Sequence, residues 1–279
     1  MLRAAHPELE PELVTITTSG DRGGGPGDKS RFVKEIEEAL LAEEIDVAVH
    51  SAKDVPGELP AGLEIAAVPP GEDARDALVG AQSIEALPAG ARVGTSSLRR
   101  RSQLLALRAD VEVVPLRGNV DTRLRKLAEG ECDAALLALA GLRRLGREGE
   151  AGGALDPDTF VPAPGQGLLA LETRLGDGTS ALLKPIADAA ARTRLDAERA
   201  VVETLDTSCH TPVGAHARVD GERIQVHAYA GLPDGSEWIT DRVEGSSDDP
   251  AGVGAEVARR MLAAGAGELL RRAAGTLGA

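Results

Sequence analysis

Short apolar strands alternate with helical stretches through the first half of this chain, and that alternation limits the possible folds more than any other feature. Residue spacing predicts strands at 13–18, 45–50, 63–68, 91–94, 111–115 and 133–140. It predicts helices at 31–44 and 119–129, and a helix that starts after the hydroxyl residues 95–97. Because strands separated by helices usually pair in parallel, we expect α/β layers with parallel sheets.

The last third of the chain has a different pattern. A helix is expected at 194–205 and a turn-rich loop at 206–214. Alternating segments follow at 215–219, 224–230 and 237–243, and a helix at 253–265. This arrangement is typical of an antiparallel sheet with its own helices, and so of a separate α+β domain.

Composition limits both the core and the location of the chain. Its 279 residues suffice for two or three domains, and with only four aromatic residues the core must consist of Ala, Val, Leu and Ile. No run of about eighteen apolar residues is present, so we expect no membrane span. Charge and proline come too early in residues 1–8 for a secretory signal, and two cysteines form no disulfide framework. These features favour the cytoplasm.

Positive charge is concentrated in one part of an acidic protein. The net charge of −14 argues against general nucleic-acid binding. From Arg92 to Arg147, however, twelve Lys and Arg outnumber six Asp and Glu, so this stretch carries +6. A basic region in an acidic chain suggests a confined anionic ligand. The alternative is a solvated, arginine-rich helix face.

Arginines follow three successive predicted strands. If those strands are parallel, their carboxyl ends meet at one edge of a sheet, where ligands bind in α/β proteins. Helix N-termini there favour anions, and guanidinium groups suit carboxylates. The arginines concerned are Arg99, Arg100, Arg117, Arg123, Arg143 and Arg144.

Lys53 and Asp54 follow the predicted strand at 45–50. A carboxylate at a strand end can stabilise a cation or move a proton. A surface Lys–Asp pair in a turn is the simpler interpretation, and the dipeptide by itself favours it.

The two cysteines have different surroundings. Cys132 lies beside an apolar strand and is expected to be buried. Cys209 lies in a loop of Ser, Thr, Pro and Gly, where an accessible thiol can serve as a nucleophile or an attachment point. Its neighbour His210 is expected to point away from it, so no Cys–His pair is predicted. The five histidines lack metal-ligand spacing, and we predict no metal.

Six segments resemble the signature stretches of the porphobilinogen deaminase (hydroxymethylbilane synthase) family. The first includes Asp54, three others carry strand-end arginines, and together they follow the family's order along nearly the whole chain. Each is modest alone, but the set is highly specific. They lie at 46–56, 93–100, 116–120, 140–146, 164–167 and 197–199.

The resemblance implies a fold of two α/β domains similar to periplasmic binding proteins and a C-terminal α+β domain. The expected boundaries are 1–70 with 167–187 for domain 1, 71–166 for domain 2 and 188–279 for domain 3. It also implies a monomer.

The resemblance further implies a transferase of tetrapyrrole (haem) biosynthesis. The family joins four porphobilinogen molecules head to tail, with loss of ammonia, and releases hydroxymethylbilane. Its dipyrromethane primer is a cofactor held by a thioether to the cysteine that matches Cys209. The implied partner is porphobilinogen, with neither nucleic acid nor membrane.

Individual residues match the family's functional positions. Asp54 matches the carboxylate that stabilises the cationic azafulvene left by deamination, and Lys53 accompanies it. The matching substrate- and cofactor-binding positions are Lys29, Ser51, Thr95, Ser96, Ser97, Arg99, Arg100, Arg117, Arg123 and Arg144.

The chain departs from the family in two places. The family begins earlier, with a strand carrying Arg-x-Ser and a first helix, and Met1 falls about where that helix should be ending. Without that strand, the strands at 13–18 and 46–50 should flank a gap. We favour a misassigned start over a truncated, poorly active form. In the glycine loop, residues 28–32 keep Lys29 and Phe32 but lack the family's glycines.

Two further function classes are open on sequence grounds. One is a cytosolic, two-lobed protein that binds a small anionic molecule without catalysis. The other is a nucleic-acid-binding regulator, which the net charge and the scarcity of aromatic residues oppose. A covalent cofactor detected in the intact mass would distinguish the enzyme from both.

Overall fold

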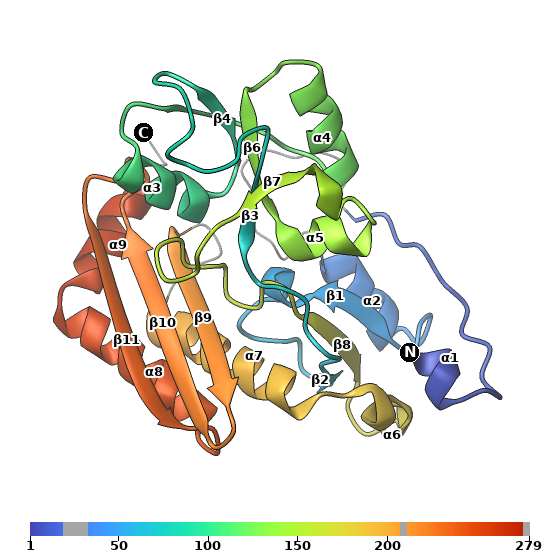
Figure 1. Ribbon diagram of the computed structural model, residues 1–279. Coiled ribbons are helices and arrows are strands. Elements are labelled where there is room, and N and C mark those ends of the chain that lie inside the picture. Colours follow the sequence, from blue (N-terminus) through green and yellow to red (C-terminus); the bar gives the residue numbers. More distant parts are fainter. Residues whose placement is uncertain (19–32, 207–210, 276–279) are drawn as a thin grey trace.

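The computed structural model describes residues 1–18, 33–206 and 211–275. These residues form three sheets, each with its own helices (Figure 1). None of the helices in these ranges is both long and apolar enough to span a membrane.

The first sheet has the order β1-β8-β2 and is antiparallel throughout. A small core of Leu40, Ala48 and Leu63 joins the first helix after residue 33 to this sheet. Its strands are β1 (Ala48–Ser51), β2 (Leu63–Ala67) and β8 (Leu169–Arg174). Its helical segments are α1 (Leu2–Ala5), α2 (Lys34–Leu41), α6 (Thr179–Leu183) and the 3₁₀ turns η2 (Ala52–Asp54) and η4 (Lys184–Ile186).

The second sheet has the order β5-β4-β6-β3-β7. β4 pairs in parallel with both β5 and β6, whereas β3 is antiparallel to β6 and β7. Its strands are β3 (Asp76–Val79), β4 (Arg92–Gly94), β5 (Glu112–Val114), β6 (Ala134–Ala138) and β7 (Ala151–Ala154). Its helical segments are α3 (Leu98–Leu107), α4 (Val120–Ala128), α5 (Leu139–Arg144) and η3 (Glu148–Glu150).

The third sheet is an antiparallel meander whose core consists almost wholly of Ala, Val, Leu and Ile, with Met261. Helices from both ends of this region pack against the sheet (Figure 1). Its strands are β9 (Val213–Asp220), β10 (Arg223–Gly231) and β11 (Trp238–Ser246). Its helices are α7 (Ala189–Thr204), α8 (Pro250–Ala263) and α9 (Ala266–Gly275).

Several local predictions are confirmed. The strands expected at 63–68, 91–94 and 111–115 correspond to β2, β4 and β5, and the helix expected at 119–129 is α4. The antiparallel C-terminal sheet is also present. The fold is therefore α/β followed by a C-terminal α+β region.

Two expectations are wrong. Residues 13–18 are in no strand, and Leu13 is 94% exposed. A strand needs a neighbour to satisfy its backbone groups, and no strand of the described ranges pairs with this stretch or with the second edge of β1. Among the strands of the described residues, parallel pairing holds only for β4, β5 and β6. β8 returns from far along the chain and pairs antiparallel with β1 and β2, and β3 is antiparallel to β6 and β7.

Two connections cross between the first and second sheets, at residues 68–75 and 155–168. They are bonded to each other, since the Gln166 amide donates to the Ala74 carbonyl at 2.7 Å. The second crossover also holds the turn after β1, because the Ala52 N–H donates to the Leu168 carbonyl at 3.0 Å. The two crossovers thus fix the edges at which the two sheets meet.

Candidate active site

The carboxyl ends of β4, β5 and β6 lie at one edge of the second sheet, because these three strands are parallel. The sequence-based expectation of a shared edge is confirmed. Thr95 follows β4, and its N–H donates to the Val114 carbonyl of β5 at 2.9 Å. The segments that follow these strands are therefore neighbours.

The start of α3 has the predicted form of a strand-to-helix junction. Ser97 is the N-cap, and its hydroxyl accepts the Arg100 N–H at 3.4 Å. The Thr95 hydroxyl accepts the Ser97 N–H at 3.2 Å. Thr95 is buried, whereas Ser96 is exposed. The hydroxyls of Thr95 and Ser97 thus order the first turn of α3.

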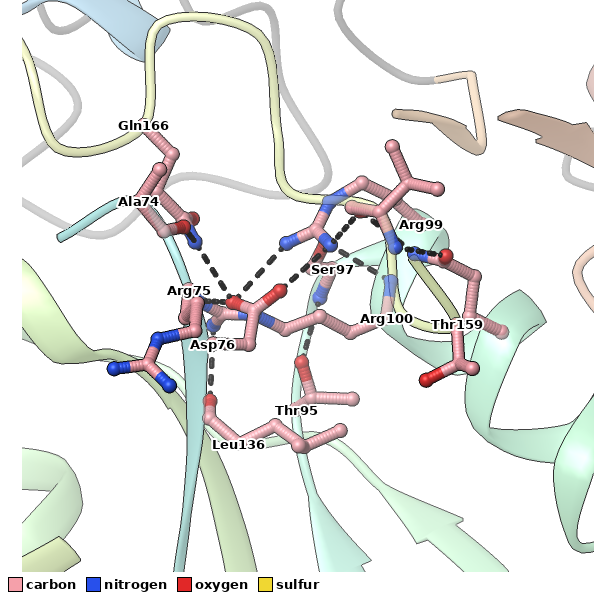
Figure 2. Close-up of polar contacts among 12 residues, drawn as sticks. Ala74, Arg75, Asp76, Thr95, Ser97, Arg99, Arg100, Leu136, Thr159 and Gln166 are labelled. Atoms are coloured by element: carbon pink, nitrogen blue, oxygen red, sulfur yellow. Dashed lines mark hydrogen bonds and ion pairs between the residues drawn. The ribbon is translucent and has the colours of Figure 1, made fainter. Parts of the chain in front are cut away.

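Arg99 and Arg100 are only 4% and 5% exposed, and both are bonded to Asp76 (Figure 2). Asp76 has no exposed surface. Although burial acts to raise it, the guanidinium groups of Arg100 and Arg99 hold the pKa of the Asp76 carboxyl well below its usual range. Sequence reasoning missed Asp76, whose only signal is one charge at the start of the apolar run Asp76–Val79.

Arg117 is exposed in the loop between β5 and α4. The next residue, Gly118, has a φ of +115°, and a Cβ there would lie 2.6 Å from the Thr122 side chain. Asn119 then caps α4 by accepting the Thr122 N–H at 2.9 Å. This tight turn sets the point at which Arg117 leaves the sheet edge.

Arg123, in α4, is partly buried, and its Nε is buried with no partner among the described residues. Burial, together with the charge of Arg100, lowers the pKa of Arg123 to about 10, and Asp54 acts to raise it. Arg123 therefore lies within electrostatic reach of both Arg100 in the second sheet and Asp54 beside the first. A buried N–H without a partner is costly unless an anion reaches it.

Asp54 ends the 3₁₀ turn Ala52–Asp54, which directly follows β1. Ser51 is its N-cap, and Lys53 and Asp54 are both partly exposed. Gly165 of the second crossover packs against this turn: its φ is +73°, and a Cβ there would lie 2.9 Å from the Lys53 nitrogen. The position of Asp54 therefore depends on the crossover.

Arg144 ends α5 and donates from Nη2 to the Gly167 carbonyl at 2.7 Å. Burial lowers the pKa of Arg144, and Glu72 acts to raise it. Arg143 faces acidic groups instead, with its Nε 2.8 Å from Glu148. Arg144 is thus bonded to the second crossover, whereas Arg143 pairs with Glu72 and Asp73 of the first crossover, each at 3.6 Å.

Two predicted functional residues, Lys29 and Cys209, lie outside the described residues, as does His210. Cys132 is buried as expected, and burial raises the pKa of its thiol. Within the described ranges, no group of three His, Cys, Asp or Glu side chains could hold a metal ion.

A surface hollow of about 530 Å³ lies elsewhere, between β2, α6 and α7. Of the cations in its lining, Arg192 pairs with Asp196 and Arg199 donates to the Gly57 carbonyl. None of the predicted site residues lines this hollow.

The arrangement joins a set of cations to one carboxylate. Arg100 and Arg123, with Arg117 and Arg144 on adjoining segments, suit a ligand that carries several carboxylates. Asp54 suits a positive charge that develops next to such an anion. The site can therefore hold a polyanion and stabilise a cation formed on it.

Comparison with known proteins agrees with this chemistry. A family profile described as "Porphobilinogen deaminase, dipyromethane cofactor binding domain" matches residues 1–181, and "Porphobilinogen deaminase, C-terminal domain" matches residues 193–263. The chain is 47% identical over 277 residues to porphobilinogen deaminase of Roseiflexus castenholzii, covering 96% of this chain and 91% of that protein. It is 48% identical over 271 residues to that of Nitrobacter hamburgensis (93% and 85%). The corresponding value for Thermus thermophilus is 45% over 273 residues (96% and 91%).

Similarity to solved structures is weaker. The periplasmic VFT2 domain of Bordetella pertussis BvgS aligns with a TM-score of 0.37 and 19% identity, over 65% of this chain and 71% of that one. Protein AF1704 of Archaeoglobus fulgidus aligns with a TM-score of 0.33 and 18% identity, over 55% and 60%.

Proposed function

The chain belongs to the porphobilinogen deaminase family, and we propose that the cluster formed by Arg100, Arg117, Arg123, Arg144 and Asp54 is its active site. The protein is a transferase of tetrapyrrole biosynthesis that polymerises porphobilinogen and uses a dipyrromethane cofactor. We propose the role of each individual residue in this cluster. The observation that carries these proposals is the buried Nε of Arg123, which has no partner in the described part of the chain, on a residue within electrostatic reach of both Arg100 and Asp54.

The arginines bind the carboxylates of the growing chain. Each pyrrole ring carries two carboxylates, so every added ring adds negative charge. Arg100 and Arg123 form the inner part of the site and Arg117 and Arg144 the outer part, in accord with their burial. The hydroxyls of Ser51, Thr95, Ser96 and Ser97 and the ammonium of Lys29 complete the proposed contacts. Arg99 attracts the ligand carboxylates through its positive charge rather than by direct contact, because Asp76 and the Val161 carbonyl occupy its Nη1.

Asp54 stabilises the positive charge that forms on porphobilinogen when ammonia leaves, and Lys53 accompanies it in the same turn. A fixed carboxylate close to a developing cation lowers the barrier, because it needs no reorganisation as the charge appears. Its removal should raise the barrier by several kcal/mol, which corresponds to about a thousandfold loss of rate.

The residues present fit a dipyrromethane, because its carboxylates can satisfy the orphaned Arg123 N–H and the excess cations around it. When bound, the cofactor would supply the pyrrole carbon to which the first ring is joined, and each later ring would be joined to the ring before it. We propose that Cys209 holds it by a thioether, while Arg100 and Arg123 bind its carboxylates and keep it oriented beside Asp54.

We also propose three domains, 1–70 with 167–187, 71–166 and 188–279, which agree with the division into three sheets. We further propose that the enzyme is a cytoplasmic monomer, free of nucleic acid and membrane. The acidic chain has just two cysteines, and this supports the cytoplasmic location. The elution volume of the pure protein tests the monomer.

Two variants test the proposed site. Asp54→Ala should lower kcat about a thousandfold while the intact mass still shows the dipyrromethane adduct. Near-normal turnover in Asp54→Ala would remove this residue from the mechanism.

Cys209→Ser should abolish both the adduct and turnover, because the serine hydroxyl is a far weaker nucleophile than a thiolate. Cys132→Ser is the matched control and should keep the adduct, since Cys132 is buried in the second sheet. An active wild-type protein with an unmodified mass would refute covalent attachment. A protein that binds porphobilinogen without turnover would instead support the non-enzymatic alternative.

A further inference from the structure

Asp76 is the centre of a buried network beneath the proposed site (Figure 2). Its Oδ1 lies 2.9 Å from Arg100 Nε and 2.8 Å from Arg100 Nη2, and it also accepts from Gln166 Nε2 at 3.1 Å. Its Oδ2 lies 2.7 Å from Arg99 Nη1. One carboxylate therefore holds two arginines and the second crossover.

The network is positively charged overall. Two guanidinium groups face a single carboxylate, and all three side chains are nearly or fully buried. Asp76 cancels one of the two charges, so one positive charge remains to attract an anion. Without Asp76, two buried cations would lie side by side with no counter-charge, an arrangement that is strongly unfavourable.

The two arginines are held differently. Arg99 Nη1 also donates to the Val161 carbonyl at 2.6 Å, and its guanidinium carbon lies 5.9 Å from the centre of the Phe160 ring. Arg100 Nη1 donates to the Leu136 carbonyl at 2.9 Å. Hydrogen bonds to Asp76 and to the Leu136 carbonyl occupy two of the five N–H groups of Arg100, and its Nη2 lies 2.8 Å from Asp76 Oδ1.

We propose that Asp76 is a positioning residue that fixes the guanidinium of Arg100 for carboxylate binding in the proposed active site. The inference rests on the proposed function, because it assumes that Arg100 binds substrate carboxylates. Asp76 does not touch the substrate. It acts by setting the direction of the free N–H groups of Arg100, on which a charge-assisted hydrogen bond depends.

The location of Asp76 supports this role. It begins β3, directly after the first crossover, and Gln166 of the second crossover bonds both Asp76 and the Ala74 carbonyl. Its backbone also pairs with Ala138, two residues beyond Leu136 in β6. Arg100 is thus held against both crossovers and the sheet, and a shift in either crossover would change its direction.

The test measures KM and kcat for porphobilinogen in Asp76→Asn, alongside thermal unfolding and the intact mass. Asparagine keeps the size of the side chain but removes the charge. At a temperature where the variant is folded, its KM should rise about tenfold or more. In the molecules that carry cofactor, kcat should fall by a smaller factor than this rise in KM. Asp76→Glu, which restores the carboxylate, should recover part of the loss.

Asp73→Asn is the matched control. Asp73 lies three residues away and pairs with Arg75 at 2.6 Å, outside the network. This variant should leave KM unchanged. If Asp76→Asn does not fold, Asp76→Glu also tests whether the carboxylate positions Arg100, because the longer side chain displaces the carboxylate by one methylene. An unchanged KM in a folded Asp76 variant, with only the unfolding temperature lowered, would overturn the positioning role.

A double-mutant cycle separates this inference from the proposed function. Arg100→Gln should raise KM by itself, and Asp76→Asn should add little in that background, because both changes disable the same contact. Additive effects on KM would show that Asp76 does not act through Arg100. If Arg100→Gln leaves KM unchanged, the proposed active site is wrong rather than the role of Asp76 alone.

Discussion

Among its single residues, Arg123 is a costly charge at the place where we propose that the ligand binds. Arg123 has a buried Nε with no partner in the described part of the chain, and another cation, Arg100, is close to it. Arg125, two residues further along the same helix, is exposed and pairs with Glu129 at 2.7 Å. The contrast supports our proposal that Arg123 serves binding rather than stability.

Replacement of Arg123 should therefore separate stability from function. In a cofactor-free Cys209→Ser background, Arg123→Met should raise the free energy of unfolding by about 1–3 kcal/mol, because it removes an unpaired buried charge. In the cofactor-bearing protein the same change should raise KM for porphobilinogen. Chemical denaturation and steady-state kinetics measure the two effects, and Arg125→Met is the control that should gain no stability.

The stability gain should also depend on pH. Because the pKa of Arg123 is lowered to about 10 in the folded protein, the cost of its charge is fully present below that pH. The cost then declines as the pH rises above about 10, because the folded protein loses this proton before the unfolded chain does. In the cofactor-free background, the difference in unfolding free energy between Arg123→Met and its parent should therefore shrink above pH 10. A constant difference would contradict an unpaired buried cation.

Among the elements, the crossover at 155–168 positions the turn that ends at Asp54, the proposed catalytic residue. Gly165 has a φ of +73°, and a Cβ there would lie 2.8 Å from the Ala52 carbonyl carbon and 2.9 Å from the Lys53 nitrogen. Both contacts are backbone, so the turn that ends at Asp54 would have to move. Only glycine allows this close approach.

Gly165→Ala should therefore lower both stability and kcat. The matched control is Gly176→Ala, where φ is +79° but no atom lies within 4 Å of the added Cβ. The control should lose about 1–2 kcal/mol from backbone strain alone, and Gly165→Ala should lose more. Thermal unfolding and turnover measure the difference. Equal losses, with kcat unchanged in both variants, would show that the contact with the turn does not matter.

Across the molecule as a whole, Glu198 of α7 connects the C-terminal region to the rest. Its side chain is 1% exposed, and it accepts the Gly165 N–H at 2.7 Å and the Ala217 N–H at 2.8 Å. One carboxylate thus ties the crossover to β9. The third sheet is joined by this contact to Gly165, which packs against the turn that ends at Asp54.

Glu198→Gln should weaken the connection between the crossover and β9. The glutamine oxygen can easily accept only one of the two backbone N–H groups, and the glutamine NH₂ then faces the other. The expected loss is about 2 kcal/mol. Trp238, the single tryptophan, reports on β11, so its fluorescence should change at a lower denaturant concentration than the far-UV circular dichroism. Glu203→Gln, on the exposed side of the same helix, is the control. Coincident, unshifted transitions in Glu198→Gln would contradict the connecting role.

Local sequence was enough to predict individual elements and the kind of ligand. Apolar periodicity was sufficient for β2, β4, β5 and α4, because each has a strong local pattern and clear turn residues at its ends. Arginines after successive strands predict an anion site, and the motif around Asp54 predicts its catalytic role; both assignments stay predictions. These features depend on residues close together in the chain.

The pairing of distant segments and the neutralisation of charges depended on the folded structure. Residues 13–18 have strand-forming composition but no strand neighbour in the described ranges, and β8 joins β1 and β2 from far along the chain. Arg99 and Arg100 look alike in sequence, yet the buried carboxylate of Asp76 holds each differently. Local sequence sets propensities, whereas strand partners and counter-charges come from contacts that exist only once the chain has folded.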